Sequence, residues 1–448
     1  MGHAFARQSP LMAQAFEQGK SRLRKMLHEQ FAVDGVHLEH SPSYFLMVYE
    51  SFLKAIDIHF MDEPETVAFM ETIERALSWL VRPNNRLANF GDSNDQSSLT
   101  GKYSSNEGWL TEEIRYVASA GELGCSPIAK YAAFQQGGYF VIRVPSQDNP
   151  LDLIQSSYLA QITGFHSRVH KHADDLSFIW MERGHDILID SGRYGYIGRT
   201  EEGSDDWQDG HWYSDKNRIY CESTRAHNTL EFDGRNYPRK GVRPYGSALT
   251  RWLEDPSGII AVETACRHFR TIRRWRVLLM MPGEWLIVID GYRDMTGAHH
   301  DVSQWFHFSP WLDLQAENMG FITHLTGVVT PLYLMPLLDG MDASRVYKGD
   351  TEPRMQGWFS PAERMLVPAP ASCFMRKNES IGVFAAILTF SANLTVHREW
   401  SAFNVTGNQG RLRWQDEKGV HTVRLDRREG NALQMSYDCQ ESMDTGVK

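Results

Sequence analysis

The chain has 448 residues, a formal net charge of −10, 42% hydrophobic residues and 23% charged residues, values typical of a folded protein with two or three domains. The acidic balance argues against nonspecific nucleic-acid binding, which depends on a basic surface. No apolar run approaches the ~18 residues that a membrane-spanning helix needs, so we expect no membrane span.

Apolar residues repeat with helical spacing up to about residue 120. Two segments open with a serine that can cap a helix and a proline at the first helical position, at Ser9-Pro10 and at Ser41-Pro42. A third segment ends at Pro83. Side chains three or four residues apart mark one face of each segment: Leu23, Met26 and Leu27; Phe45, Val48, Phe52 and Ile56; Met70, Ile73, Leu77 and Leu80. We therefore predict an α-helical domain over residues 1–125.

From about residue 137 the apolar residues follow a period of two. Residues 137–144, GGYFVIRV, are typical of a strand. Turns at Arg183-Gly184, Pro282-Gly283 and Lys418-Gly419 each divide an apolar run in two, which predicts three hairpins. Hairpins with few helices between them indicate a large antiparallel β-sandwich. We place it at residues 126–448, so the fold class is α+β multidomain.

The stretch HKHADDLSF, residues 170–178, carries two histidines two positions apart. We expect this stretch to be extended. Alternate side chains of a strand share a face, so Arg168, His170 and His172 would project together, with Lys171 on the opposite side. Two imidazoles on one face are a common beginning of a zinc site, but two ligands do not suffice.

Two further groups complete a candidate zinc set with His172. Asp190 ends an apolar strand, where an unpaired carboxylate is costly, and His227 precedes another apolar strand. A His, Asp, His set suits zinc. The residues alone leave alternatives open: a hydrogen-bonded histidine pair, Asp190 as the cap of a turn before Gly192, and His227 as a satisfied core histidine.

Other polar and aromatic groups each have two interpretations. The loop FGDSND, residues 90–95, is interpreted as a solvated turn rather than as part of a cleft. Trp207 and Trp212 lie in a polar segment and are candidates for stacking on sugar rings, whereas Trp180 and Trp305 lie in strand patterns and are expected in the core. The five cysteines form no CxxC pattern and are expected to be free buried thiols. A basic cluster is either an anion-binding surface or a solvated face: Arg218, Arg225, Arg235, Arg239, Lys240 and Arg243.

The segments HKHADDLSFIWMERGHDILIDSGRYGY and STRAHNTLEFDGRNY resemble the heparinase II/III-like family of polysaccharide lyases. The upstream segment DGVHLEHSPSYF, residues 34–45, is similar to the part of that family that carries a catalytic tyrosine. The family joins an incomplete (α/α) toroid to an antiparallel β-sandwich, which agrees with the helical and strand regions above. The resemblance implies a carbon–oxygen lyase that cleaves a 4-linked uronic-acid polysaccharide by β-elimination.

The resemblance also implies catalytic residues. Tyr44 and His170 fall on the catalytic tyrosine and histidine. Tyr213 is the candidate for a second active-site tyrosine, with Tyr194 and Tyr220 as competitors. In the elimination a base removes the proton at C5 and an acid protonates the departing O4. A tyrosine can do both where nearby cations favour its ionised form.

Binding roles are implied in the same way. Glu39, Arg193 and Trp212 are expected to contact the substrate, an acidic polysaccharide or oligosaccharide whose carboxylate must be neutralised. A structural zinc ion is expected at His172, Asp190 and His227. Association into a homo-oligomer, the identity of the polymer and endo or exo action are left open.

Two features depart from the family pattern. An Asn-His pair normally precedes the tyrosine, but the 43 residues ahead of Tyr44 contain none, so we expect an N-terminally shortened chain whose own activity is open. Phe45 stands where the family often has histidine. A secretion signal in a missing segment would make the protein periplasmic or secreted, whereas the sequence as it stands would be cytoplasmic.

Two alternatives to the lyase therefore stay open, a catalytically impaired carbohydrate-binding or structural relative and a zinc-dependent hydrolase. Elimination leaves a 4,5-unsaturated sugar that absorbs ultraviolet light, whereas hydrolysis leaves none.

Overall fold

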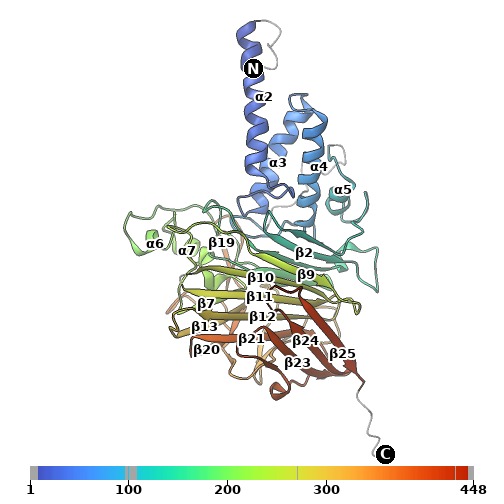
Figure 1. The fold of residues 1–448 in the computed structure, drawn as a ribbon, viewed down its shortest axis with the longest axis vertical. Helices are drawn as coiled ribbons and strands as arrows, with labels where there is room; N and C mark the ends of the chain where they lie inside the picture. The colour runs from blue at the N-terminus through green and yellow to red at the C-terminus, as the bar shows by residue number, and fades with distance from the viewer. Residues whose placement is uncertain (1–8, 96–98, 100–107, 270, 429, 442–448) are drawn as a thin grey trace, which may run out of the picture.

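The computed structural model has helices followed by strands, in the order that the sequence predicts (Figure 1). It describes residues 9–95, 99, 108–269, 271–428 and 430–441. The outer limits of the two predicted domains, residues 1 and 448, lie outside this part of the chain. Among the described residues no helix is both long and apolar enough to cross a membrane.

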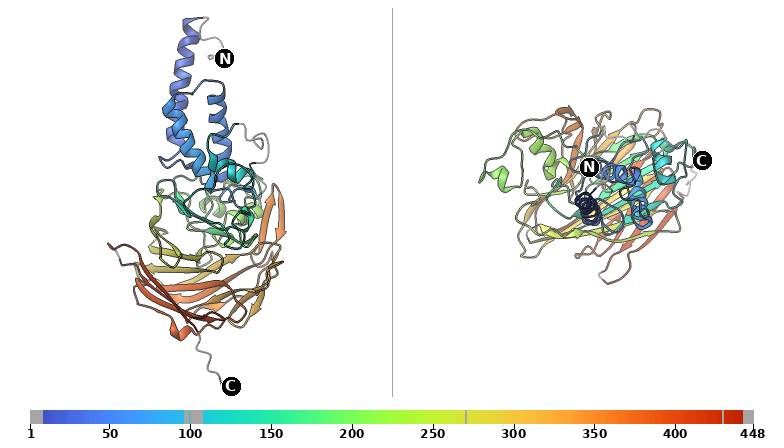
Figure 2. Two further views of the ribbon diagram at one scale, coloured as in Figure 1. Left: turned by 90° about the vertical axis from the view of Figure 1, so that its right-hand side faces the viewer. Right: turned by 90° about the horizontal axis from the view of Figure 1, so that it is seen from above.

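The helices at the N-terminal side stand together at one end of the strands (Figures 1 and 2). Their bounds are α2 Pro10–Gln30, α3 Pro42–Asp57, α4 Pro64–Trp79 and α5 Glu112–Ala118. The predicted caps are present: Ser9 Oγ accepts a hydrogen bond from the Met12 N–H at 3.2 Å, and Ser41 Oγ accepts one from the Tyr44 N–H at 3.3 Å. The (α/α) toroid stays a prediction.

The buried faces of the helices differ in part from the predicted stripes. In α2 only Leu27 is buried, and Met26 is 44% exposed. In α3 the buried face includes Tyr49 and Leu53 beside Phe45 and Phe52. The reason is that α3 has neighbours on two sides, which widens its buried face beyond a single stripe.

The described strands pair antiparallel. Their sheets are β1-β2-β3-β5-β6, β14-β15-β16-β21-β12-β11-β10-β9, β17-β20-β13-β7, β22-β23-β24-β25 and the two-stranded β18-β19 and β4-β8. The bounds are β1 Tyr131–Phe134, β2 Tyr139–Val144, β3 Ser157–Ile162, β4 Gly164–Phe165, β5 Phe178–Glu182, β6 His185–Leu188, β7 Leu230–Phe232, β8 Gly246–Ser247, β9 Leu249–Glu254, β10 Ile260–Phe269, β11 Ile272–Met281, β12 Trp285–Asp294, β13 His300–His307, β14 Gln315–Glu317, β15 Gly320–Thr323, β16 Leu332–Pro336, β17 Asp342–Ala343, β18 Trp358–Ala362, β19 Met365–Pro368, β20 Ala371–Glu379, β21 Ile381–Phe390, β22 Ala402–Phe403, β23 Gln409–Asp416, β24 Gly419–Asp426 and β25 Gln434–Gln440. Short helices α6 Asp205–Gln208 and α7 Lys216–Glu222 and 3-10 turns η1 Leu153–Gln155, η2 Thr224–Ala226 and η3 Arg398–Trp400 interrupt them.

The five-stranded sheet is shared between two hydrophobic cores. Along β2, Tyr139 and Val141 pack with the helices, whereas Phe140 and Ile142 pack with the large sheets. This division follows from the alternation of side chains along a strand. Arg143 ties the sheet to the end of α4 by donating to the Ser78 carbonyl at 2.9 Å.

The predicted hairpins lie in three different sheets. β5 and β6 turn at Arg183-Gly184 in the five-stranded sheet, and β11 and β12 turn at Pro282-Gly283 in the eight-stranded sheet. β23 and β24 turn beside Gly419 in the C-terminal sheet. The C-terminal sheet packs on one face of the eight-stranded sheet through Trp285 and Trp414, whose rings meet edge to face at 5.3 Å.

Candidate functional site

Tyr44 and His170 lie against each other, although one comes from α3 and the other from the turn before β5. Their rings stack with centroids 3.5 Å apart and planes 12° apart. His170 Nδ1 lies 3.0 Å from Glu39 Oε2, and this contact holds the pKa of Glu39 below its usual range. The ionised carboxylate can only accept, so Nδ1 is the donor, and in the neutral imidazole the lone pair is then on Nε2.

The segment that carries His170 is not a strand, which corrects the prediction of a shared strand face. Residues 166–177 form turns and bends, and His170 has a φ of 54°. A left-handed residue interrupts the alternation of side chains that a pleated strand imposes. Arg168, His170 and His172 therefore point into three different surroundings, and only His172 is fully buried.

Backbones from two other segments meet this turn. His40 Nε2 accepts a hydrogen bond from the backbone N–H of His166 at 2.8 Å, so the proton of this imidazole is on Nδ1, which donates to the Val169 carbonyl at 3.1 Å. Gly91 has a φ of 54°, and a Cβ there would overlap the carbonyl oxygens of His170 and His40. The segment before α3, the loop at residue 91 and the turn at residue 170 are thus held in close contact.

A second tyrosine connects Tyr44 to a buried carboxylate. The Tyr44 and Tyr196 hydroxyls are 3.0 Å apart, and the Tyr196 hydroxyl donates to Asp92 Oδ2 at 2.9 Å. Burial, and then the negative charge of Asp92, raise the pKa of Tyr196, so it stays protonated. The hydrogen between the two phenols therefore belongs to Tyr44.

Sequence reasoning missed Tyr196 and favoured Tyr213. Tyr213 stacks on the ring of Tyr196 with centroids 4.9 Å apart, so it borders the site without joining the hydrogen bonds above. The other two tyrosines considered, Tyr194 and Tyr220, make contacts to the β18 strand instead. The segment SGRYGY offered no signal to separate Tyr196 from Tyr194.

The acidic loop at residues 90–95 is buried, which corrects the prediction of a solvated turn. Asp92 is 4% exposed, and its Oδ1 lies 3.0 Å from His172 Nε2 and 2.5 Å from the Arg218 guanidinium. Burial opposes ionisation of Asp92, but Arg218 and His172 outweigh it and hold its pKa below the usual range. The apolar residue Phe90 at the start of the loop was the available signal.

Much of the basic cluster is also buried. Arg218 bridges Asp92 and Glu222, and Glu222 additionally binds Arg239 at 2.9 Å and His211 at 2.5 Å. Burial works against the charge of Glu222, yet Arg218 and Arg239 hold its pKa well below the usual range. Neither a solvated face nor an anion-binding surface describes these arginines, because they neutralise internal carboxylates.

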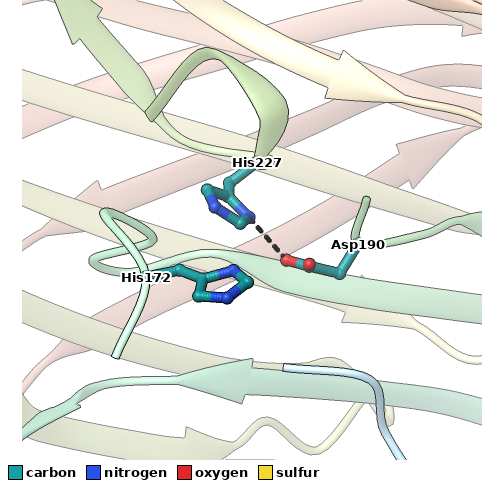
Figure 3. A group of neighbouring side chains, drawn as sticks. All are labelled: His172, Asp190 and His227. Carbon is teal, nitrogen blue, oxygen red and sulfur yellow. Dashed lines mark hydrogen bonds and ion pairs between the residues drawn. The ribbon is translucent and has the colours of Figure 1, made fainter. Parts of the chain in front are cut away.

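His172, Asp190 and His227 converge in a fully buried group (Figure 3). One ligand atom from each lies within 4.8 Å of the others, and His227 Nδ1 is 2.8 Å from Asp190 Oδ2. The three come from different segments: the turn before β5, the chain after β6 and the end of η2. Asp92, His172 and Glu222 satisfy the same distance, but Arg218 already binds both of those carboxylates.

The donor set of this buried group fits zinc. His172 Nδ1 and His227 Nε2 are buried and have no hydrogen-bond partner among the described residues. Unpartnered buried nitrogens are costly, so protein atoms alone do not satisfy these two imidazoles. Asp190 also accepts the Gly192 N–H at 3.2 Å, so the capping role considered as an alternative is present as well.

Of the residues predicted to bind substrate, Arg193 lies beside Tyr196, and Trp212 lies under Arg168. Arg193 Nε donates to Asn94 Oδ1 at 2.8 Å, and its guanidinium lies 5.0 Å from the Tyr196 ring. Trp212 is 56% exposed, with the Arg168 guanidinium 3.9 Å above its ring. The third, Glu39, contacts His170 as described above.

The remaining expectations on single side chains hold in part. Trp180 and Trp305 are buried as expected, and Trp207 contacts the Lys240 ammonium group. All five cysteines are free, but only three are buried: Cys221, Cys266 and Cys373 are buried, and Cys125 and Cys439 are exposed.

Solved heparinase structures have a similar fold. The heparan sulfate lyase HepC from Pedobacter heparinus matches with a TM-score of 0.72 and 16% identity over 98% of this chain and 64% of that one. A heparinase III gene product matches with a TM-score of 0.71 and 18% identity over 98% and 64%. Another structure named heparinase III gives 0.72 and 15% over 94% and 66%. The chain thus spans less than two thirds of the length of these proteins, and at such identities the likeness shows the fold.

A family model assigns the chain to a family, which the solved structures alone do not do. A search of curated proteins finds no match. The model described as heparinase II/III-like, C-terminal, matches residues 127–367, more than half of the chain and the part that carries His170, His172, Asp190 and His227. The chain belongs to the heparinase II/III-like family.

Proposed function

We propose that the protein is a lyase that cleaves a 4-linked uronic-acid polysaccharide by β-elimination. The observation that carries this proposal is the stacking of the Tyr44 phenol on the His170 imidazole at 3.5 Å. The two groups together offer the base and the acid that the reaction needs, and both are partly exposed. Membership in a family of polysaccharide lyases supports this chemistry.

The directions of the hydrogen bonds favour a division of the two proton transfers. In the neutral imidazole of His170 the lone pair is on Nε2, because Nδ1 donates to Glu39, and this form is suited to take the C5 proton. Tyr44 keeps its hydroxyl hydrogen, which points to Tyr196, so Tyr44 is suited to protonate O4. The electron pair of the C5–H bond becomes the C4–C5 double bond as the C4–O4 bond breaks.

The substrate carboxylate needs a positive partner as the proton leaves C5. Arg193 is suited to this role because its guanidinium lies beside the Tyr196 ring and its present ion pair, to Glu363 at 2.6 Å, is with a partly exposed carboxylate. A bidentate guanidinium–carboxylate contact with the substrate would replace that pair.

Product absorbance tests the proposal. The wild-type chain, incubated with acidic polysaccharides that differ in uronic acid and sulfation, is expected to produce ultraviolet-absorbing unsaturated sugars from at least one of them. Tyr44→Phe and His170→Gln should each lose at least about 100-fold of that rate, because each lacks one proton-transfer group. Reducing ends that accumulate without absorbance would indicate hydrolysis and contradict the proposal.

We further propose that His172, Asp190 and His227 hold a structural zinc ion. Such an ion would crosslink three segments beneath the Tyr44–His170 pair and add to the free energy of folding. His172 also contacts Asp92, so the buried group and the tyrosines share one hydrogen-bond network.

Metal content and stability together test the zinc site. His172→Ala should lower both the zinc-to-protein ratio after dialysis and the melting temperature, because a ligand and a buried contact are lost. His421→Ala is the matched control: His421 is buried in the C-terminal sheet on Asp416, so its loss should lower stability alone. Equal zinc in wild type and His172→Ala would refute the site.

A further inference from the structure

A cavity lies on the face of the eight-stranded sheet that points away from Tyr44 and His170. Along β11, Arg274 and Arg276 point toward the turn before β5, where they bind Asp175 at 2.5 Å and the Leu176 carbonyl at 2.7 Å. The alternate residues of β11, among them Trp275, face the C-terminal sheet. The cavity on this second face has a volume of about 610 Å³, within the range of small-ligand sites.

Two arginines of the cavity wall are placed directly opposite each other. Arg273 of β11 and Arg293 of β12 are register partners, and both are exposed. Like charges in such a cross-strand pair repel. In the described part of the chain neither guanidinium lies within ion-pair distance of a carboxylate, although the whole chain has a net charge of −10.

The one buried carboxylate that the described residues place in the cavity wall does not compensate this charge. Glu263 is 2% exposed and is bound by both Arg251 and Arg427, the latter at 2.6 Å. The two positive charges of Arg251 and Arg427 therefore already exceed the single negative charge of Glu263. Among the described residues no carboxylate offsets the positive charge of Arg273 and Arg293, which leaves this charge open to an anionic ligand.

The cavity wall around the two arginines is closely packed. Trp275 lies against Gly291, its register partner, so closely that a Cβ on Gly291 would overlap the indole. The Arg427 guanidinium lies 3.7 Å from the same ring. Asn408 accepts from Arg427 through Oδ1 at 3.0 Å, which leaves its NH₂ group as a donor at the cavity wall. A fixed wall with several donors lowers the entropy cost of binding an anion.

We propose that this cavity is a second, non-catalytic binding site for an acidic oligosaccharide, with a sulfate or carboxylate group held between Arg273 and Arg293. Guanidinium groups bind such oxyanions through paired hydrogen bonds, and two of them on adjacent strands can grip one group. The assignment of the anion to a sugar rests on the proposed function. The inference that the cavity binds an anion does not rest on it. Bound there, a long polymer would be retained beside the enzyme between cleavages.

Calorimetry on the full chain tests the second site. In a Tyr44→Phe background, which prevents turnover, a sulfated uronic-acid tetrasaccharide is expected to bind in two equivalents at low salt. Arg273→Gln/Arg293→Gln should remove one equivalent, or weaken it at least tenfold. Arg424→Gln, which removes an exposed strand arginine from β24, should keep both.

Other results of this experiment would contradict either the second site or the proposed lyase activity. Retention of both equivalents in the double variant overturns the proposal, as does equal binding of a neutral tetrasaccharide or of sodium sulfate alone at the cavity. If wild type makes no unsaturated product but a single equivalent disappears in the double variant, the second site stands and the lyase fails. The free double variant should melt no lower than Tyr44→Phe alone, because the substitution removes a repulsion. A lower melting temperature would mean that the arginines are structural and would count against the site.

Discussion

Tyr196 illustrates how one side chain can matter without being among the groups that exchange protons with substrate. Its hydroxyl donates to Asp92 and accepts from Tyr44, so it fixes the position of the Tyr44 hydroxyl. Because burial and Asp92 raise the pKa of Tyr196, it does not compete with His170 as a base.

Tyr196→Phe should therefore lower kcat by about 10–100-fold while changing KM little, since positioning of an acid affects the chemical step. Tyr213→Phe is the matched control, because it keeps the ring that stacks on Tyr196 and removes a hydroxyl outside the hydrogen-bond chain. We expect its kcat to stay within about threefold of wild type. Equal kcat values in both variants, measured by product absorbance, would contradict a positioning role for the Tyr196 hydroxyl.

At the scale of single residues, the sequence predicted the residues whose chemistry requires a partner better than those whose role depends on a distant contact. His172, Asp190 and His227 were found because imidazole and carboxylate beside apolar strands need partners, and they do converge. Tyr196 and Asp92 were missed because their importance arises from each other, and they are separated by over a hundred residues. Such a pairing leaves no local pattern in the chain.

At the scale of elements, the site depends on a junction of three backbones at Gly91. Its φ of 54° suits glycine, and no room exists for a Cβ between the carbonyl oxygens of His40 and His170. The junction holds the start of α3, which carries Tyr44, against the turn that carries His170.

Gly91→Ala should therefore destabilise the fold and separate the two rings. Gly258→Ala is the matched control, because Gly258 has a φ of 93° with nothing within 4 Å, so it shares the backbone strain without the overlap. We expect Gly91→Ala to lose about 1–3 kcal/mol more in urea unfolding than Gly258→Ala, with a large fall in kcat. Equal losses would mean that backbone strain, and not close approach, limits this position.

The elements themselves were largely predictable. Serine caps followed by proline marked the starts of α2 and α3, and glycine turns marked the hairpins, because these signals act within a few residues. The turn at residues 166–177 was mistaken for a strand, since its left-handed His170 is imposed by contacts with the loop at Gly91 and has no local signature.

At the scale of the whole molecule, the helices and the large sheets meet through one layer. The sequence predicted that β2 is a strand. Its four successive apolar residues, YFVI, also indicate that both of its faces are covered. Figure 2 shows the helices rising from the strands at that layer. A loss of packing in the shared sheet should therefore destabilise both hydrophobic cores.

Buried titratable groups in both cores determine how this stability changes with pH. Burial lowers the pKa of His37 to about 4 and those of His40 and His307 to about 3, from an ordinary value of 6.5. At a pH between the lowered pKa values and 6.5, these three histidines bind protons in the unfolded chain but not in the folded chain. The stability that the neutral histidines contribute is thus complete above pH 6.5 and is lost as the pH falls.

Glu182 acts in the opposite direction. Burial raises its pKa from 4.5 to about 7, so the folded chain holds the extra proton, and this contribution is present in acid and lost as the pH rises toward 7. Burial raises the pKa of Glu74 as well, so these two carboxyls oppose the three histidines. The net expectation is a loss of stability as the pH falls from 6.5 toward 4.

His37 provides the sharpest test of this expectation, because it is 2% exposed and neither ring nitrogen has a hydrogen-bond partner among the described residues. Its ring lies between Phe31 and Phe45. His37→Phe removes the titrating group but keeps an aromatic ring, so it should recover up to about 3 kcal/mol of the stability that wild type loses between pH 6.5 and 4.

The measurement is urea unfolding of wild type and His37→Phe at pH 7 and at pH 4.5, with His59→Phe as the control. His59 has an 81% exposed side chain, so its removal should leave the pH dependence unchanged. If His37→Phe loses as much stability in acid as wild type does, burial of that imidazole does not contribute, and the acid sensitivity must come from other buried groups, such as His40, His307 and Asp92.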